Sequence, residues 1–318
     1  MRRPSMQKTT LLTWLLFMAL ANAFGQTGPT LVDLSYTVPP ILTVAPGQIV
    51  NFNVTGLNTV LSAPVKANQT PLPTVLAGIS VTLNQRTFTG GGSVSLPVPL
   101  LSILLTNRCA GPGPFSSDCY ITTITGQIPF EITVLSHGLP GADIVIPYNG
   151  VNSQHFGLNT NPDRIHLLTV THADGSQVTM ASPAVPGEVV VVYALGLGKT
   201  NPAVPTGQPT TIPAPVVTTA LAVLFDFTPN AGPLIPAQLM DMLPPAVSVP
   251  EFAGLTPGEV GLYQINVKLP NTFPSVPVCA GSPIGAFTIY SNLTINISDG
   301  NPINPSSDGA PICILPPS

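Results

Sequence analysis

Charged side chains are scarce in this sequence. Asp, Glu, Lys and Arg make up 7% of the 318 residues, against about 25% in an ordinary globular domain. Nine basic and thirteen acidic residues give a net charge of −4. That balance offers no basic footprint for nucleic acid and no polybasic cluster for anionic lipid. Because hydrophobic residues reach 44%, we expect the chain to bury a core instead of remaining disordered.

Long apolar runs are also missing, apart from a short one near the N-terminus. A basic segment (2–8) precedes the apolar run 11–20 (LLTWLLFMAL), and Ala21-Asn22-Ala23 follows. A membrane span needs about 20 apolar residues, whereas this layout is typical of a secretory signal peptide. We therefore predict a signal peptide over 1–23 with cleavage after Ala23. The mature chain then carries 6 − 13 = −7 charges, has no stable membrane span, and is secreted/extracellular or cell-envelope associated.

We find no convincing amphipathic helix in the mature sequence. Proline accounts for 39 residues, and proline breaks helix interiors and removes a backbone donor. Short runs of Val, Ile, Leu and Thr lie between the prolines, as expected for strands joined by turns. The sequence therefore predicts an all-β fold.

Cysteine is limited to four residues. Export makes disulfides plausible, and neighbours in sequence would pair as Cys109–Cys119 and Cys279–Cys313. Sequence alone leaves all three possible pairings open. A metal site is the rival interpretation, but no Cys-x-x-Cys pair and no Cys/His cluster supports it. We expect no metal and no cofactor.

The chain contains an internal repeat. APGQIVNFNVTGL (45–57) matches VPGEVVVVYALGL (185–197) at an offset of 140, and FEITV (130–134) resembles YQINV (263–267) at an offset of 133. We predict a first unit over 24–140 and a second over 141–318, whose tail from Asp299 is irregular. Residues 141–183 are expected to supply leading strands of the second unit.

Each repeat begins with a Pro-Gly turn followed by a strand. IVNFNV alternates apolar and polar residues, as in a strand with one solvated face. VVVVYAL is apolar throughout, which predicts a strand covered on both faces or lying at an interface. Short strands with regular turns favour two immunoglobulin-like β-sandwich units in tandem, since such a sandwich needs about 100 residues.

These segments carry a resemblance to known families. PGQIVNFNVTGLN (46–58) resembles the opening of IPT/TIG-type immunoglobulin-like domains. Residues 165–297, which include VPGEVVVVYALGLGKTNPAVPTGQP and PGEVGLYQINVKLP, resemble the C-terminal domain of uncharacterised secreted acidobacterial (Solibacter-type) proteins. The resemblance implies an exported immunoglobulin-like module of unassigned function and supplies no catalytic residues. The long segment 228–250 and the four cysteines depart from the family pattern.

Chemistry for catalysis is sparse. No Gly-x-Ser-x-Gly elbow is present. The densest titratable cluster consists of Asp163, His166, His172 and Asp174, which we interpret as surface residues near turns. Glu188 follows the second Pro-Gly turn where Gln48 follows the first, and a position that accepts both side chains indicates a polar turn site. We predict that the protein is not an enzyme and has no catalytic residues.

The remaining interpretation is a structural and protein-interaction protein whose partner lies on a protein or cell-envelope surface. The apolar segment 228–250 offers a possible interaction loop through Leu239, Met240, Met242 and Leu243. The alternative is a carbohydrate-binding accessory module, with polysaccharide as its partner. Trp14, the single tryptophan, lies in the predicted signal peptide, so that alternative depends on an exposed row among the six tyrosines.

Overall fold

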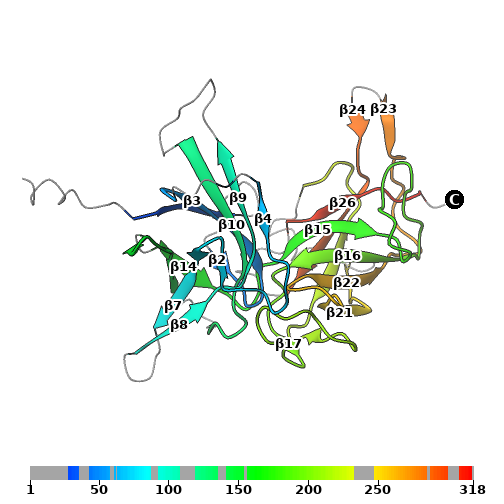
Figure 1. Ribbon diagram of the computed structural model, residues 1–318. Helices are drawn as coiled ribbons and strands as arrows, with labels where there is room; N and C mark the ends of the chain where they lie inside the picture. The colour runs from blue at the N-terminus through cyan, green and yellow to red at the C-terminus, as the bar shows by residue number, and fades with distance from the viewer. Residues whose placement is uncertain are drawn as a thin grey trace, which may run out of the picture.

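The described part of the chain consists of strands, turns and loops, with no α-helix in the computed structural model (Figure 1). The structure describes residues 28–35, 43–57, 61, 63–86, 92–107, 119–134, 141–153, 156–232, 247–284, 287–299 and 308–316. The predicted all-β fold is confirmed. None of the described segments forms a helix that is long and apolar enough to cross a membrane.

The N-terminal lobe is built from two five-stranded sheets, in the orders β1-β3-β10-β9-β4 and β2-β14-β11-β7-β8. All neighbours are antiparallel except β14 and β2. Buried side chains from both sheets, such as Phe52 and Leu83, share one core. The strands are β1 Thr30–Ser35, β2 Thr43–Val44, β3 Ile49–Thr55, β4 Val65–Lys66, β7 Thr82–Arg86, β8 Ser93–Pro97, β9 Leu100–Asn107, β10 Tyr120–Gln127, β11 Ala142–Val145 and β14 Phe156–Thr160.

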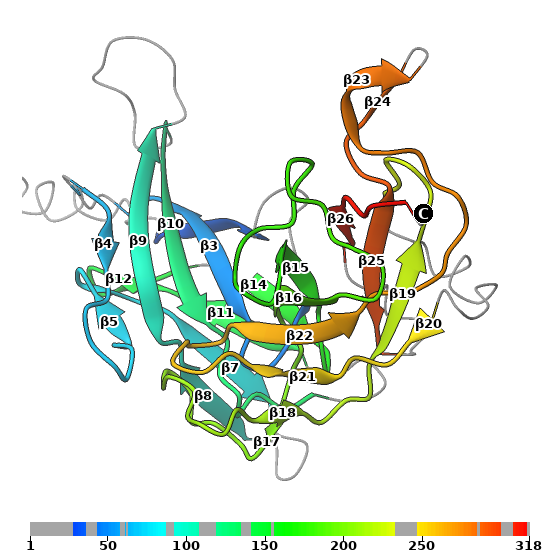
Figure 2. The same ribbon diagram turned by 90° about the vertical axis from the view of Figure 1, so that its right-hand side faces the viewer.

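The C-terminal lobe pairs a six-stranded sheet, β15-β16-β22-β21-β18-β17, with a four-stranded sheet, β20-β19-β25-β26. Figure 2 shows β16, β22, β21 and β18 as neighbours, with β25, β19 and β20 to their right. A second core, which includes Val192 and Ile295, lies between these sheets. The strands are β15 His166–Thr171, β16 Val189–Leu195, β17 Thr200–Asn201, β18 Val216–Val217, β19 Ala222–Asp226, β20 Val247–Ser248, β21 Phe252–Leu255, β22 Tyr263–Lys268, β25 Leu293–Ser298 and β26 Ala310–Ile312.

Three small two-stranded hairpins stand outside these sheets. They are β5 Val75–Leu76 with β6 Ile79–Ser80, β12 Pro147–Tyr148 with β13 Val151–Asn152, and β23 Ala280–Ile284 with β24 Phe287–Ile289.

The two lobes repeat one strand topology. The order β1-β3-β10-β9-β4 has the same connectivity as β15-β16-β22-β21-β18, and β8-β7-β11-β14 has the same connectivity as β20-β19-β25-β26. β3 and β16 are offset by 140 residues, as are β7 and β19. The parallel pair Val44–Thr160 recurs as the parallel bridge Ala184–Ile314, again 140 residues on from Val44. The sequence repeat is therefore a repeat of the fold, while its immunoglobulin-like assignment stays a prediction.

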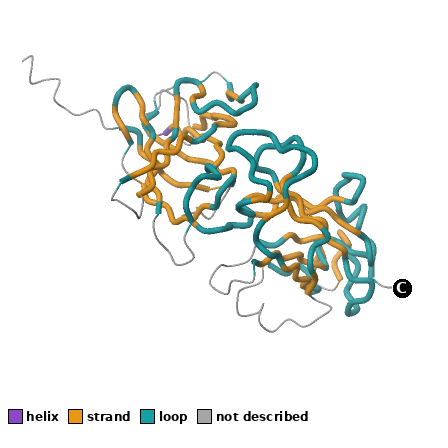
Figure 3. Tube along the Cα trace, turned by 90° about the horizontal axis from the view of Figure 1, so that it is seen from below, coloured by secondary structure: helices purple, strands orange, loops and turns teal. Residues whose placement is uncertain are grey.

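This topology moves the expected boundary between the units. β11 pairs with β7, and β14 pairs with β11 and β2, so residues 142–160 complete the N-terminal lobe. They occupy the places that β25 and β26 occupy in the C-terminal lobe. The expected second unit from residue 141 thus begins too early, because a sandwich closes only when its last two strands return to the second sheet. The lobes separate between Thr160 and His166, and Figure 3 shows the strands gathered in two groups.

Three other expectations differ from the structure. β16 is not covered on both faces, because its burial alternates and Val189, Val191 and Tyr193 are half-buried. The C-terminal tail is not wholly irregular, because β26 pairs with β25 there. Segment 130–134 forms a turn and loop, and the strand that pairs with β3, as β22 pairs with β16, is β10.

A disulfide ties the tail to the body, as expected: Cys279 bonds to Cys313 across 34 residues of sequence. Cys119 is also disulfide-bonded, while Cys109, its expected partner, lies outside the described residues. The predicted cleavage site at Ala23 and the expected interaction residues Leu239, Met240, Met242 and Leu243 also lie outside them.

Buried polar side chains join the two lobes. Gln127, 1% exposed, accepts a hydrogen bond from Gly207 N at 2.7 Å and donates one to Gly47 O at 3.4 Å. Leu72 N donates to Gly207 O at 2.8 Å. Phe130 from the N-terminal lobe belongs to the core of the C-terminal lobe. These contacts hold the lobes in one fixed arrangement.

The Cys279–Cys313 bond is expected to stabilise the C-terminal lobe. Replacing both residues by alanine should lower the free energy of unfolding by about 3–4 kcal/mol, because the bond closes a loop of intermediate length in the unfolded chain. Urea unfolding of the oxidised wild type and the double variant measures the difference. Equal midpoints would show that the tail contributes nothing to the stability of the lobe.

Gln127→Ala is expected to lower the free energy of unfolding by about 1–3 kcal/mol, since it leaves the buried N–H of Gly207 without its acceptor. Gln69, an exposed glutamine, provides the matched control: Gln69→Ala should change stability by no more than about 0.5 kcal/mol. Equal unfolding midpoints for the two variants would contradict the role given to Gln127 at the junction.

Candidate functional site

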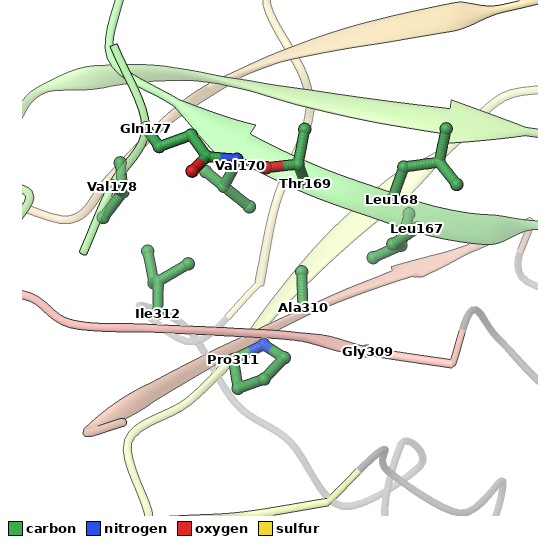
Figure 4. A pocket seen from close by; sticks show the side chains of 10 residues that line it. All are labelled: Leu167, Leu168, Thr169, Val170, Gln177, Val178, Gly309, Ala310, Pro311 and Ile312. Atoms are coloured by element: carbon green, nitrogen blue, oxygen red, sulfur yellow. Dashed lines mark hydrogen bonds between the residues drawn. The ribbon is translucent and has the colours of Figure 1, made fainter. Parts of the chain in front are cut away.

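A groove opens between β15 and β26, the edge strands of the two C-terminal sheets (Figure 4). Most of its lining residues have apolar side chains, although polar atoms supply most of its accessible surface. Its volume is about 300 Å³. The two strands lie side by side but belong to different sheets. The groove is lined by Leu167, Leu168, Thr169, Val170, Gln177, Val178, Gly309, Ala310, Pro311 and Ile312.

A bulge in β15 gives the groove its exposed apolar rim. The pairing of β15 with β16 shifts register between Leu167 and Thr169, and the extra residue of a β-bulge is left outside the regular pairing. Leu168 is therefore 48% exposed, while Leu167 and Val170 on either side are buried. In Figure 4, Ala310 and Ile312 point from β26 toward β15, and Pro311 points away from it.

Two backbone groups of β15 beside the groove are already hydrogen-bonded. Leu167 N donates to the Asp308 carboxylate at 2.8 Å, and Val170 O accepts a hydrogen bond from Val178 N at 3.0 Å. Pro311 in β26 has no N–H to offer. Edge strands are commonly protected from further strand pairing in this way. An added strand could therefore not pair regularly with this edge of β15.

Sequence reasoning missed these groove residues. The Leu167-Leu168 doublet interrupts the alternation of β15, which is the one local signal of the bulge. Asp308 lies 141 residues from Leu167, and no local pattern places it there. Asp308 also contacts the ring of His166, so this histidine is half-buried and paired.

The predicted titratable cluster is divided among three environments. Asp163 is buried, 1% exposed, and His166 meets Asp308. His172 Nδ1 lies 2.5 Å from the Glu188 carboxylate. Asp174 accepts hydrogen bonds from Ser176 Oγ and N within a turn, and these bonds lower the pKa of Asp174. The expectation of surface residues near turns is therefore wrong for Asp163, while Asp174 is exposed and His166 and His172 are half-buried.

His172 links three segments of the C-terminal lobe. Its Nδ1 meets Glu188, whose second oxygen accepts from Val185 N at 2.9 Å. Its Nε2 lies 3.2 Å from both the backbone oxygen and the hydroxyl of Ser182. The hydrogen bond to Glu188 is the largest cause that raises the pKa of His172, and the Ser182 carbonyl and the charges of Glu188 and Asp174 add to it.

The grouping of Ser182, His172 and Glu188 contains the residue types of a catalytic triad. A triad requires a neutral Nε2 that accepts the serine proton. Here Nε2 also faces the carbonyl oxygen of Ser182, which can only accept. With an acceptor at each ring nitrogen, the imidazole serves as a two-sided donor, and the grouping clamps the 179–188 segment to the end of β15.

Other candidate chemistry is limited within the described ranges. These residues contain no group of three His, Cys, Asp or Glu side chains placed to hold a metal ion. Tyr263 is fully buried, and burial raises its pKa while its hydroxyl donates to Gly198 O at 2.5 Å. Tyr290 is 68% exposed, and Tyr120, Tyr148 and Tyr193 are half-buried. Tyr36 lies outside the described residues.

The His172 clamp predicts a pH dependence of stability. Because folding raises the pKa of His172, its contribution is fully present below the unfolded value of about 6.5 and is lost as pH rises through the folded pKa. Urea midpoints of the wild type should therefore exceed those of His172→Gln by more at about pH 5.5 than at about pH 9. Glu188→Gln should remove most of this pH dependence, and a gap that stays constant with pH would contradict the clamp.

Comparison with known proteins leaves the chain without a family. No family model matches it, and no curated protein matches it. A solved structure titled BspA_C_mut is similar to the chain at 10% identity, covering 77% of this chain and 84% of that one, with a TM-score of 0.19. A likeness this distant supports no statement about fold or function.

Proposed function

We propose that this chain is a secreted or envelope-associated, non-catalytic protein that acts in structure and protein interaction. The groove between β15 and β26 is its contact site, where Leu168 on the rim packs against a bulky apolar side chain of a partner polypeptide. The observation that carries the proposal is the exposed apolar side chain of Leu168 on the rim of a groove whose lining side chains are mainly apolar. Apolar anchors seated in such pockets supply much of the energy of protein interfaces.

Two further features support this proposal. The Cys279–Cys313 disulfide suits an exported protein, in agreement with the predicted signal peptide and the resemblance to secreted IPT/TIG-like modules. The fixed junction between the lobes suits a rigid structural part, because Gln127 and Phe130 bury their side chains across it. The groove therefore lies on a protein whose two lobes are already fixed relative to each other before a partner binds.

The carbohydrate-binding alternative finds less support. Binding of sugars by stacking needs several exposed aromatic rings, and among the described tyrosines Tyr290 alone is exposed. We keep it as an outcome of the experiment below.

Leu168→Asp is expected to weaken binding to envelopes of the host organism about tenfold, because it places a charge on the apolar rim of the groove. The measurement is retention of purified mature protein on those envelopes over a concentration series. Ile212→Asp is the matched control, since Ile212 is an exposed apolar residue, 85% exposed, that does not line the groove.

A photo-crosslinking amino acid at position 168 extends this test to the partner. It should join one envelope polypeptide, and unlabelled wild type should compete where Leu168→Asp does not. The same crosslinker at position 212 should not join that polypeptide. Equal binding of both aspartate variants would overturn the groove as the contact site. Retention on insoluble polysaccharide, competed by its soluble fragments, would instead favour the carbohydrate-binding alternative.

A further inference from the structure

A second cavity lies at the junction of the two lobes and goes beyond the proposed interaction function. Its volume is about 390 Å³, within the usual range of about 300–1,000 Å³ for small-molecule sites. One wall comes from the N-terminal lobe, at the turn that follows β10, and the other from the 199–205 segment of the C-terminal lobe. The lining residues are Phe130, Glu131, Lys199, Thr200, Ala203, Val204 and Pro205.

Hydrogen bonds fix both walls of this cavity. Thr206 Oγ1 accepts from Phe130 N at 2.8 Å and donates to the Glu131 carboxylate at 2.5 Å. The backbone oxygen of Lys199 accepts from Thr218 N at 2.9 Å. Gly207 is held by Gln127 at the buried end of the junction. The cavity is therefore formed in advance, which lowers the ordering cost that a ligand would meet.

The floor of the cavity is apolar and its sides are charged. Phe130 and Val204 are buried, with 9% and 8% of their surfaces exposed. Glu131 and Lys199 are exposed, and within the described part of the chain neither makes an ion pair. Two of seven lining residues are charged, although charged residues make up only 7% of the chain. One acid and one base thus flank an apolar floor without neutralising each other.

We propose that this cavity binds a small zwitterion with an apolar body, of the chemical class of an α-amino acid with a branched aliphatic side chain. The ammonium group faces the Glu131 carboxylate, the carboxylate faces the Lys199 ammonium, and the aliphatic group packs on Phe130 and Val204. Each charge on the ligand then meets an opposite charge, while the aliphatic group is removed from water on the apolar floor. A ligand with only one of these charges would pair with only one of the two side chains, Glu131 or Lys199.

Three probes of matched shape test this assignment by isothermal titration calorimetry. L-leucine carries both charges, 3-methylbutylamine keeps only the ammonium, and 4-methylpentanoate keeps only the carboxylate. Leucine should bind with one site, and each single-charge probe about tenfold or more weaker. Glu131→Gln should weaken leucine binding about tenfold and leave the binding of 4-methylpentanoate little changed. Lys199→Gln should also weaken leucine binding about tenfold, but it should leave the binding of 3-methylbutylamine little changed.

Glu251→Gln and Lys268→Gln are the matched controls, because both residues are exposed and neither lines the cavity. They should leave leucine binding at the wild-type value. No saturable leucine binding up to about 10 mM would overturn the proposal, as would equal binding of the three probes or binding that is insensitive to Glu131→Gln and Lys199→Gln. None of these results depends on the groove between β15 and β26.

Discussion

The Pro-Gly turn that leads into the central strand of each lobe is the constraint on which the rest of the fold depends. Gln48 accepts a side-chain hydrogen bond from Ala45 N at 2.8 Å, and Glu188 accepts the same bond from Val185 N at 2.9 Å. Gly47 and Gly187 adopt φ of +75° and +78°, where a side chain is strained. Each turn delivers β3 or β16 between two neighbours, and both cores form around these strands.

The sequence repeat predicts these turns and strands well, because the same offset joins β3 to β16 and β7 to β19. It fails at the last two strands of the first lobe. In that lobe the segment 128–141 connects β10 to β11, whereas in the second lobe the longer segment 269–292, which holds the β23–β24 hairpin, connects β22 to β25. Because these connecting segments differ in length, the 140-residue offset no longer holds beyond them. The last two strands therefore match in fold although their sequences no longer align at that offset. Residues 142–160 then look like the start of a new unit, although their hydrogen bonds close the old one.

The candidate sites depend on contacts that no local pattern encodes. Asp308 reaches β15 from 141 residues away, and Thr206 joins Phe130 and Glu131 across the junction. Composition still supplies part of the reasoning. In a chain with so few charges, a pair of charged side chains on one cavity, or a carboxylate on a strand edge, stands out once the fold brings them together. Scarcity of charge also leaves apolar side chains such as Leu168 without polar cover on the surface.

The exchange of Gln48 for Glu188 at equivalent positions follows from what lies beyond each turn. Gln48 is completely buried at the junction and donates to Arg164 O at 3.4 Å. A carboxylate there would face a carbonyl oxygen with no proton to share and would lose its hydration. Glu188 keeps 17% of its side-chain surface exposed and meets His172, which supplies a donor and a positive charge. The same turn position thus holds an amide side chain at the junction of the two lobes and a carboxylate beside His172. The repeated fold tolerates both, because the Gln48 and Glu188 side chains each accept the same backbone hydrogen bond within the turn.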